Sequence, residues 1–142
     1  ACTLRGLKNT QVIDVLNIEN EKYDTILLLM NGTGIFETLD RTTVYLQKLK
    51  SLLQPSGQIL IDSSDIIYMF DEDEDGGKWI PSDNYYGELT FTLQYKNETE
   101  IPFPWLYLDY NTLQNAAIAN GLQCQLVLEG DHFDYLAQLT IL

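Results

Sequence analysis

The feature that most constrains the fold is an unbroken apolar run, "TILLLM", at residues 25–30. Apolar residues without alternation predict a strand that is buried on both faces, as in a parallel sheet. Leucines at helical spacing follow over residues 39–53, and Pro55 ends that pattern. A second apolar run, residues 58–62, completes a strand–helix–strand unit with a right-handed crossover. The sequence therefore predicts an α/β fold.

The flanking segments add further predicted elements. A short strand, "QVIDV", is predicted at residues 11–15, ahead of the apolar run. Residues 87–95 alternate between apolar and polar side chains, and residues 101–108 can return beside them as an edge strand that tolerates prolines. These two segments predict a β-hairpin insertion at about residues 85–109. A helix over residues 112–120, capped by Asn111 or Thr112, and two final strands complete the pattern.

Composition narrows the class of protein. The chain has 142 residues, of which 45% are hydrophobic, and this length suits one domain with a sizeable core. A net charge of −13 argues against a nucleic-acid or anionic-membrane partner, because phosphate groups require clustered Lys and Arg. No apolar run approaches the roughly 18 residues of a membrane span. Cys2 and Cys124 read as two free thiols, so we expect a cytoplasmic protein.

The first residues predict a chain that starts inside a helix. The segment "ACTLRG" reads as a last helical turn that ends at Gly6, a residue type favoured just after helices. On this reading, residues 1–142 form a single truncated domain.

The loop after the first apolar run admits several interpretations. Gly32 and Gly34 stand two residues apart between a strand and a helix, as in phosphate-binding loops. The third glycine of a dinucleotide fingerprint is missing, and so is the Lys of a P-loop. A tight turn that lifts the chain off the strand explains the same residues. A glycine that lets the backbone approach a ligand is a third interpretation.

Order and spacing of the segments resemble one enzyme family. The stretches "YDTILLLMNG" and "LQKLKSLLQPSGQILIDSSD" resemble the fourth and fifth strands, with the helix between them, of class I S-adenosylmethionine-dependent methyltransferases. Upstream, "RGLKNTQVIDVLNI" resembles the end of the second helix and the third strand of that family. Downstream, "TLQNAAIANGLQCQLVLEG" and "FDYLAQLTIL" resemble its last helix and final strand pair.

The resemblance implies a fold, a cofactor and cofactor-binding residues. The implied fold is a Rossmann-like methyltransferase sheet that lacks its first two strands and has an antiparallel final strand. S-adenosylmethionine is the implied cofactor of the parent protein. Its binding here should be weak or absent, because the family's glycine-rich loop and ribose-binding carboxylate have no counterpart in the chain. The positions that match the family's cofactor-binding segments are Asp14, Val15, Leu16, Met30, Asn31 and Gly32.

Two further groups of residues could serve the chemistry. Aromatic residues after the second predicted strand could form a substrate lid or simply cover the end of the sheet; they are Tyr68, Trp79, Tyr85 and Tyr86. Asp71, Asp73 and Asp75 match the first half of a calcium-binding EF-hand loop, but its later ligands and flanking helices are missing. We therefore interpret this run as a solvated acidic loop and predict no metal site.

These observations predict part of a methyltransferase that acts on a small molecule and is inactive or weak as this chain. A non-catalytic binding or assembly module, with the hairpin and the acidic loop as its working surface, is the alternative. Another Rossmann enzyme, such as a dehydrogenase, is a further alternative. The apolar strand at residues 25–30 should lie at a sheet edge and pair with a second copy of the chain, which predicts a homodimer.

Overall fold

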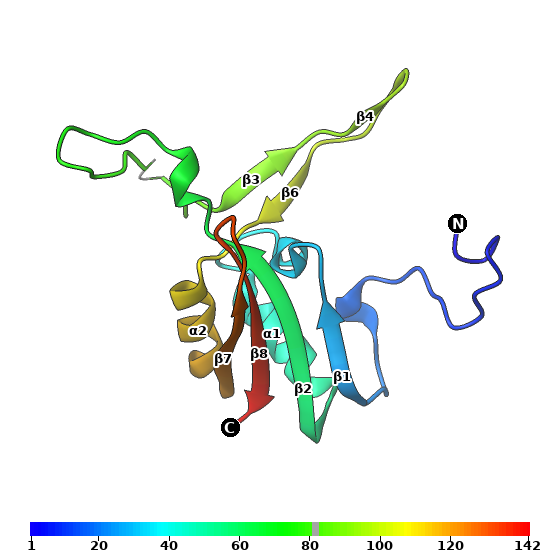
Figure 1. The fold of residues 1–142 in the computed structure, drawn as a ribbon. Helices are drawn as coiled ribbons and strands as arrows, with labels where there is room; N and C mark the ends of the chain where they lie inside the picture. Colours follow the sequence, from blue (N-terminus) through cyan, green and yellow to red (C-terminus); the bar gives the residue numbers. More distant parts are fainter. Residues whose placement is uncertain (81–82) are drawn as a thin grey trace.

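The computed structural model describes residues 1–80 and 83–142 and contains one four-stranded sheet, a projecting hairpin and two α-helices (Figure 1). Three short 3₁₀ segments are η1 (Val15–Asn17), η2 (Gly32–Phe36) and η3 (Ile66–Met69). The helices are α1 (Thr42–Ser51) and α2 (Tyr110–Ala119). The strands are β1 (Tyr23–Leu28), β2 (Leu53–Ser64), β3 (Glu88–Phe91), β4 (Gln94–Tyr95), β5 (Glu98–Thr99), β6 (Phe103–Leu106), β7 (Leu122–Glu129) and β8 (Asp134–Ile141).

The main sheet has the strand order β1-β2-β8-β7. Strand β1 runs parallel to β2, with Thr25 opposite Gln58 and Leu28 opposite Ile61. Strand β8 is antiparallel to both of its neighbours, β2 and β7. This mixed sheet confirms the predicted α/β fold with an antiparallel final strand.

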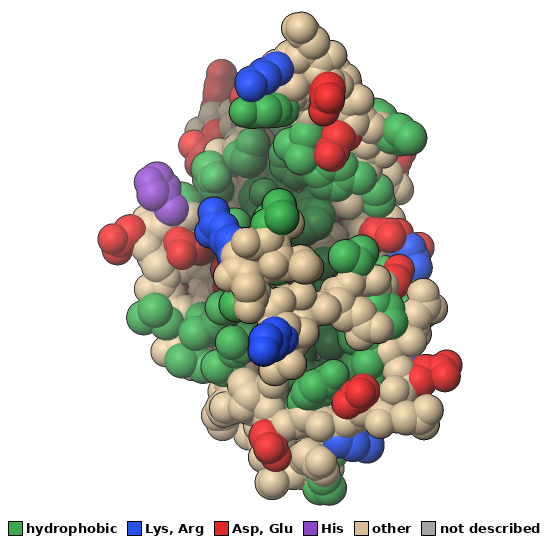
Figure 2. Space-filling model, turned by 90° about the vertical axis from the view of Figure 1, so that its right-hand side faces the viewer, with side chains coloured by type: hydrophobic (Ala, Val, Ile, Leu, Met, Phe, Trp, Pro, Cys, Tyr) green, Lys and Arg blue, Asp and Glu red, His purple; other side chains and the backbone are tan. Residues whose placement is uncertain are grey.

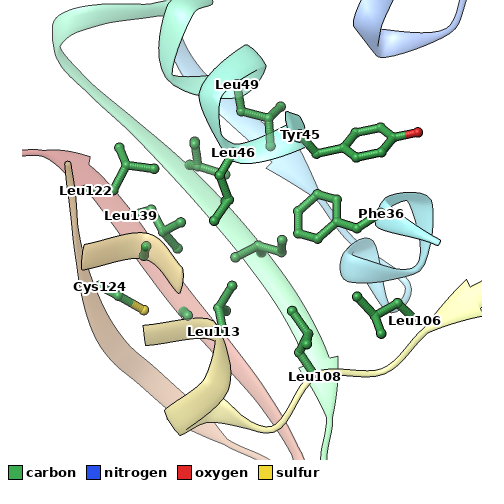
Figure 3. Packing of buried hydrophobic residues seen from close by; sticks show 14 of the residues in the cluster. Phe36, Tyr45, Leu46, Leu49, Leu106, Leu108, Leu113, Leu122, Cys124 and Leu139 are labelled. Atoms are coloured by element: carbon green, nitrogen blue, oxygen red, sulfur yellow. The ribbon is translucent and has the colours of Figure 1, made fainter. Parts of the chain in front are cut away.

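The hydrophobic core lies between one face of this sheet and the two helices (Figure 3). Alternation along β2 and β8 directs every second residue into it, because side chains of a strand point to opposite faces in turn. Helix α1 contributes a stripe at helical spacing, as its leucine pattern predicted. The fully enclosed side chains include Phe36, Leu46, Leu49, Ile59, Ile61, Leu113 and Leu139.

Both helices begin at residues other than those predicted. Helix α1 starts at Thr42, three residues after Leu39, and Pro55 falls inside β2. Helix α2 starts at Tyr110, and its cap is Asp109, whose carboxylate accepts a hydrogen bond from the Thr112 backbone. Asn111 and Thr112 were thus the wrong caps, since an Asp placed earlier already satisfies the exposed N–H groups of the first turn.

The N-terminal side of the sheet differs most from expectation. Residues 11–14 form no strand, because they have no neighbouring strand with which to exchange hydrogen bonds. Strand β1 lies at the edge of the sheet, as predicted, but Leu27 is 59% exposed, so the prediction of burial on both faces was wrong. Figure 2 looks onto this side and shows hydrophobic side chains over much of it.

The hairpin projects away from the main sheet (Figure 1). Strand β3 pairs with β6 in antiparallel register, and β4 pairs with β5 near the tip. The chain reverses at Lys96, which has a φ of 55°. Both prolines of the returning segment, Pro102 and Pro104, lie on or beside β6, which pairs only with β3 in the described structure.

The two cysteines are free thiols, with Cys2 exposed and Cys124 buried. Within residues 1–80 and 83–142, no helix has both the length and the apolar character needed to cross a membrane.

Candidate functional site

The segment that follows β1 has a left-handed backbone conformation, which is unfavourable for residues other than glycine. Met30 and Asn31 both have left-handed conformations, with φ values of 65° and 59°. Glu37, which follows η2, has a φ of 69°. A left-handed L-residue costs about 1–2 kcal/mol, and such residues cluster at functional sites. The Met30 side chain is 89% exposed, so it is available to a ligand at the carboxyl end of β1.

A buried polar network joins the ends of β1 and β2 to the hairpin. Asn31 Nδ2 donates to the Leu106 carbonyl at 3.0 Å, and Ser63 Oγ donates to Asn31 Oδ1 at 3.0 Å. Thr33 Oγ1 lies 2.6 Å from Ser63 Oγ and donates to the Leu106 carbonyl at 2.9 Å. The Leu108 N–H donates to Ser63 Oγ at 3.0 Å. The Asn31 amide therefore fixes the hairpin to the sheet.

The two glycines of the loop have different roles. The Gly32 N–H donates to Asp62 Oδ1 at 3.0 Å, which ties the loop to the end of β2. A Cβ atom on Gly34 would lie 1.9 Å from the indole ring of Trp105. Gly34 is thus required because the hairpin packs its Trp105 ring directly on the loop backbone. This contact favours the tight-turn interpretation of Gly34 over phosphate binding, since the indole already covers that residue.

The other predicted cofactor segment lies beside α1. The Asp14 carboxylate accepts a hydrogen bond from the Leu16 N–H at 2.9 Å and thereby caps η1. Val15 and Leu16 are half-buried and pack against the core. The pKa of Arg41 is raised mainly by its hydrogen bond to Glu37, and the charge of Asp14 adds to this. The segment η1 thus packs beside α1, with the Asp14 carboxylate capping its first turn.

The lid candidates separate into three groups. Tyr85 and Tyr86 lie together, with ring centroids 4.7 Å apart. Tyr68 does not contact this pair in the described structure and stacks on Phe133 at 4.8 Å. Trp79 belongs to the acidic loop and is 72% exposed. Two of the four predicted residues thus contact each other, and the other two lie apart from them.

Tyr85 and Tyr86 are both hydrogen-bonded to carboxylates of the main domain. The Tyr86 hydroxyl donates to Asp65 Oδ1 at 2.7 Å, and the Tyr85 hydroxyl donates to Asp109 Oδ1 at 2.6 Å. Burial raises the pKa of Tyr85 to about 12, and burial also raises the pKa of Tyr86. Burial opposes ionisation of Asp109, but hydrogen bonds from Thr112 and Tyr85 outweigh it and lower the pKa of the Asp109 carboxyl.

A cavity of about 510 Å³ opens beside these carboxylates. It lies between the end of β2, the start of α2 and the turn that joins β7 to β8. Aromatic rings and carboxylates share its wall, which gives it affinity for neutral or cationic groups rather than anions. The residues that line this cavity include Asp65, Asp109, Tyr110, Glu129, Phe133 and Asp134.

The acidic loop is organised around one of its own side chains. Asp73 Oδ1 accepts hydrogen bonds from the backbone N–H groups of Asp75 at 3.0 Å and Gly77 at 2.6 Å. Glu72 forms an ion pair with Lys78 at 3.1 Å. In the described parts of the chain, no group of three or more His, Cys, Asp or Glu side chains is placed to hold a metal ion. That Asp71, Asp73 and Asp75 bind no metal stays a prediction.

Sequence reasoning missed two residues that shape this region. Asp109 has a local signal, because an Asp three residues before Thr112 fits a helix cap. Trp105 has no such signal, since its partner Gly34 is distant in the sequence and only the folded hairpin brings them together.

Solved structures provide the similarity of this chain to known proteins. No known family profile matches the chain, and neither does any curated protein. A solved SAM-dependent methyltransferase from Bacteroides fragilis, in complex with S-adenosyl-L-homocysteine, is 44% identical over 98% of this chain, with a TM-score of 0.88. The chain spans 56% of the length of that protein.

More distant structures share the fold. An S-adenosylmethionine-dependent methyltransferase from Clostridium acetobutylicum is 13% identical, with a TM-score of 0.64 over 99% of this chain and 68% of its own. The methyltransferase CcbJ from Streptomyces caelestis is 10% identical, with a TM-score of 0.59 over 92% of this chain and 62% of its own. The chain thus has the fold of the S-adenosylmethionine-dependent methyltransferases, and the resemblance predicted from its sequence is confirmed.

Proposed function

We propose that this chain is part of an S-adenosylmethionine-dependent methyltransferase that acts on a small molecule. The observation that carries the proposal is 44% identity, over 98% of the chain, to a methyltransferase in complex with S-adenosyl-L-homocysteine. The exposed Met30 and the strained backbone at the carboxyl end of β1 support it, because ligands of α/β sheets bind beyond the carboxyl ends of strands.

The residues of this chain fit one side of such a cofactor. Val15 and Leu16 are half-buried apolar side chains that suit the face of a flat ring, and the exposed Asp14 carboxylate suits an amino group. Met30, Asn31 and Gly32 would lie along the methionine end. When bound, the sulfonium supplies an electrophilic methyl group. The chain's own task is to align an acceptor with it and to exclude water.

The acceptor in this proposal is a neutral or cationic small molecule. The 510 Å³ cavity has the size of a small-molecule site, and its carboxylates disfavour an anionic acceptor. Phe133 lines it and would contribute an apolar surface, with Tyr68 stacked on its ring. On this proposal, Tyr85 and Tyr86 bind the carboxylates that line the cavity, while Trp79 takes no part.

Binding of the cofactor to this chain alone should be weak, because the chain holds no glycine-rich loop and no ribose-binding carboxylate of the kind the family uses. Each missing buried polar partner costs about 1–3 kcal/mol. Titration with S-adenosyl-L-homocysteine, followed by amide chemical shifts, should move the signals of residues 14–16 and 30–32 at millimolar ligand. NAD, which shares the adenosine but lacks the amino-acid end, serves as the matched control and should leave the signals of residues 30–32 unchanged.

Two outcomes would contradict this account. Chemical-shift changes confined to other residues would show that the cofactor does not bind at residues 14–16 and 30–32. Micromolar affinity in calorimetry would contradict the expected weakness. If neither ligand binds while a partner protein captures the exposed hairpin tip at Leu93, Tyr95 and Ile101, the non-catalytic module becomes the better function.

We further propose that the chain self-associates through β1. Leu27 is exposed on this edge strand and Leu29 directly after it, and Asp24 is the only charged residue of the strand. Exposed apolar strand edges pair readily with another chain. A homodimer would cover the hydrophobic side of the molecule seen in Figure 2.

A further inference from the structure

The start of the hairpin is tied to two different elements of the main domain. Asp65 follows β2 and also accepts a hydrogen bond from the Ile67 N–H at 3.0 Å. This second bond holds its carboxylate in place independently of Tyr86. Asp109 is the cap of α2, and its backbone N–H donates to the Tyr85 hydroxyl at 3.0 Å. The Tyr85 hydroxyl thus both donates to and accepts from one residue, which fixes its position closely.

Neighbouring contacts keep the two tyrosines in register. Phe70 meets the Tyr86 ring edge-on at 6.0 Å. The next residue, Gly87, accepts a hydrogen bond from the Tyr107 N–H at 2.8 Å. A Cβ atom on Gly87 would lie 1.8 Å from the Tyr107 carbonyl oxygen, so the two hairpin segments touch here without space for a side chain. The tyrosine pair therefore cannot shift along the hairpin.

Both carboxylates that bind the tyrosines also line the 510 Å³ cavity. Resting on the function proposed above, we propose that Tyr85 and Tyr86 are positioning residues. They tie residues 84–92 to Asp65 and Asp109 and so hold these two carboxylates in place in the wall of the acceptor site. We call the pair and its two carboxylates, Asp65 and Asp109, the tyrosine latch. The latch acts through the carboxylates, and neither phenol needs to touch the acceptor.

The protonation states agree with a positioning role. With a pKa of about 12, the Tyr85 hydroxyl keeps its proton near neutral pH and remains a donor. A phenol of this pKa is a poor general base at pH 7, since an effective base has a pKa near the working pH. The lowered pKa of Asp109 keeps its carboxylate charged as the acceptor.

The test is hydrogen exchange of the whole chain carrying Tyr85→Phe and Tyr86→Phe. These changes remove two hydroxyl oxygens and keep both rings. Loss of hydrogen bonds to charged groups should speed exchange in residues 84–92 on the order of 10- to 100-fold. Amides of β2 and β8 should keep their protection. Tyr95→Phe, at the exposed hairpin tip, is the matched control and should change neither region.

Three results would overturn the latch. These are unchanged exchange in residues 84–92, equal acceleration over the whole chain, and a Tyr95→Phe effect as large as that of the pair. If the double variant fails to fold, Tyr86→Phe alone gives the same comparison. Asp109→Asn, which keeps an oxygen acceptor and a helix cap, should give an intermediate acceleration. No cofactor is added, so a negative result for the latch is independent of the titration with S-adenosyl-L-homocysteine.

Discussion

The two edges of the main sheet are built differently. Strand β7 exposes Gln123 and Gln125, then Leu126, Val127 and Leu128, ends in Glu129, and contains a register shift between Leu126 and Leu128. Polar residues and bulges are the usual devices that prevent an edge from pairing with another chain. Strand β1 has its register shift at its start, between Tyr23 and Thr25, and continues from residue 25 to its end without a charge or a proline. The shift interrupts the exposed apolar residues of β7 but precedes those of β1, so β1 is the edge less protected against pairing.

This difference explains why β1 reads as a central strand in the sequence. Its apolar run matches the composition of parallel strands that are covered on both sides. Its only paired neighbour is β2, so half of its backbone groups face outward. The composition of β1 is thus typical of a strand that pairs on both sides, whereas in the described chain it pairs on one side only.

The largest change in stability should come from the two faces of β2, the strand next to β1, because one face is covered by helices and the other is not. Ile61 is fully buried against the helices, and its neighbour Leu60 is half-buried on the opposite face. Ile61→Ala should lower the free energy of unfolding by about 3 kcal/mol, and Leu60→Ala by less than about 1.5 kcal/mol. Urea denaturation measures both. Equal losses would mean that the second face is also covered, and a Leu60→Ala loss that grows with protein concentration would attribute that cover to self-association.

The next effect should distinguish the two edges themselves. Leu27→Lys places a charge on β1 and should weaken self-association at least tenfold, which corresponds to about 1.4 kcal/mol. Val127→Lys places the same charge on the bulged part of β7 and should leave association unchanged. Sedimentation equilibrium at micromolar concentrations compares the variants. Dissociation by Val127→Lys alone, or a wild-type chain that stays monomeric, would refute pairing through β1.

A smaller effect is expected where β1 ends. Met30 is left-handed with an exposed side chain, so Met30→Gly should relieve backbone strain and lose little packing. The gain in the free energy of unfolding should be about 0.5–1 kcal/mol after the entropy cost of glycine. Thr25→Gly, in the extended part of β1, should instead be destabilising. Thermal unfolding ranks the two variants, and a lower melting temperature for Met30→Gly would rule out strain there.

The smallest effect is expected in the acidic loop, which lies outside both edges. Millimolar calcium should leave the melting temperature unchanged, because Asp73 already accepts backbone hydrogen bonds and binding to the native state is required for a shift. Differential scanning fluorimetry with calcium and with a chelator tests this. A calcium-dependent rise that disappears in Asp73→Ala would establish a metal site at Asp71, Asp73 and Asp75.

Local patterns were enough to predict most of the fold. Leucine spacing predicted α1, alternation predicted the hairpin, and apolar runs predicted β1 and β2; the two final strands, β7 and β8, were also predicted. The strand predicted at residues 11–15 was wrong, because a strand exists only with a neighbour and sequence pattern does not supply one. The predicted burial of β1 on both faces was wrong, whereas its predicted position at a sheet edge is confirmed.

The candidate site was less accessible to sequence reasoning. Proposals for Asn31 and Gly32 came from their position after a strand, but the bonds of Asn31 to Leu106 and Ser63 depend on where the hairpin packs. The pairing of Tyr85 with Asp109 likewise joins residues that no local period relates. Such contacts arise from tertiary packing, which propensity and periodicity do not encode.

The contact between Gly34 and Trp105 makes two distant positions depend on each other during evolution. Any side chain at position 34 requires the indole to leave, and a small residue at position 105 would leave a void above the glycine. Substitutions at these two positions should therefore be inherited together. Among homologous sequences, a glycine at position 34 accompanied by a tryptophan at position 105 would mark those in which the hairpin is docked on the loop, and a larger residue at position 34 would mark those in which it is not.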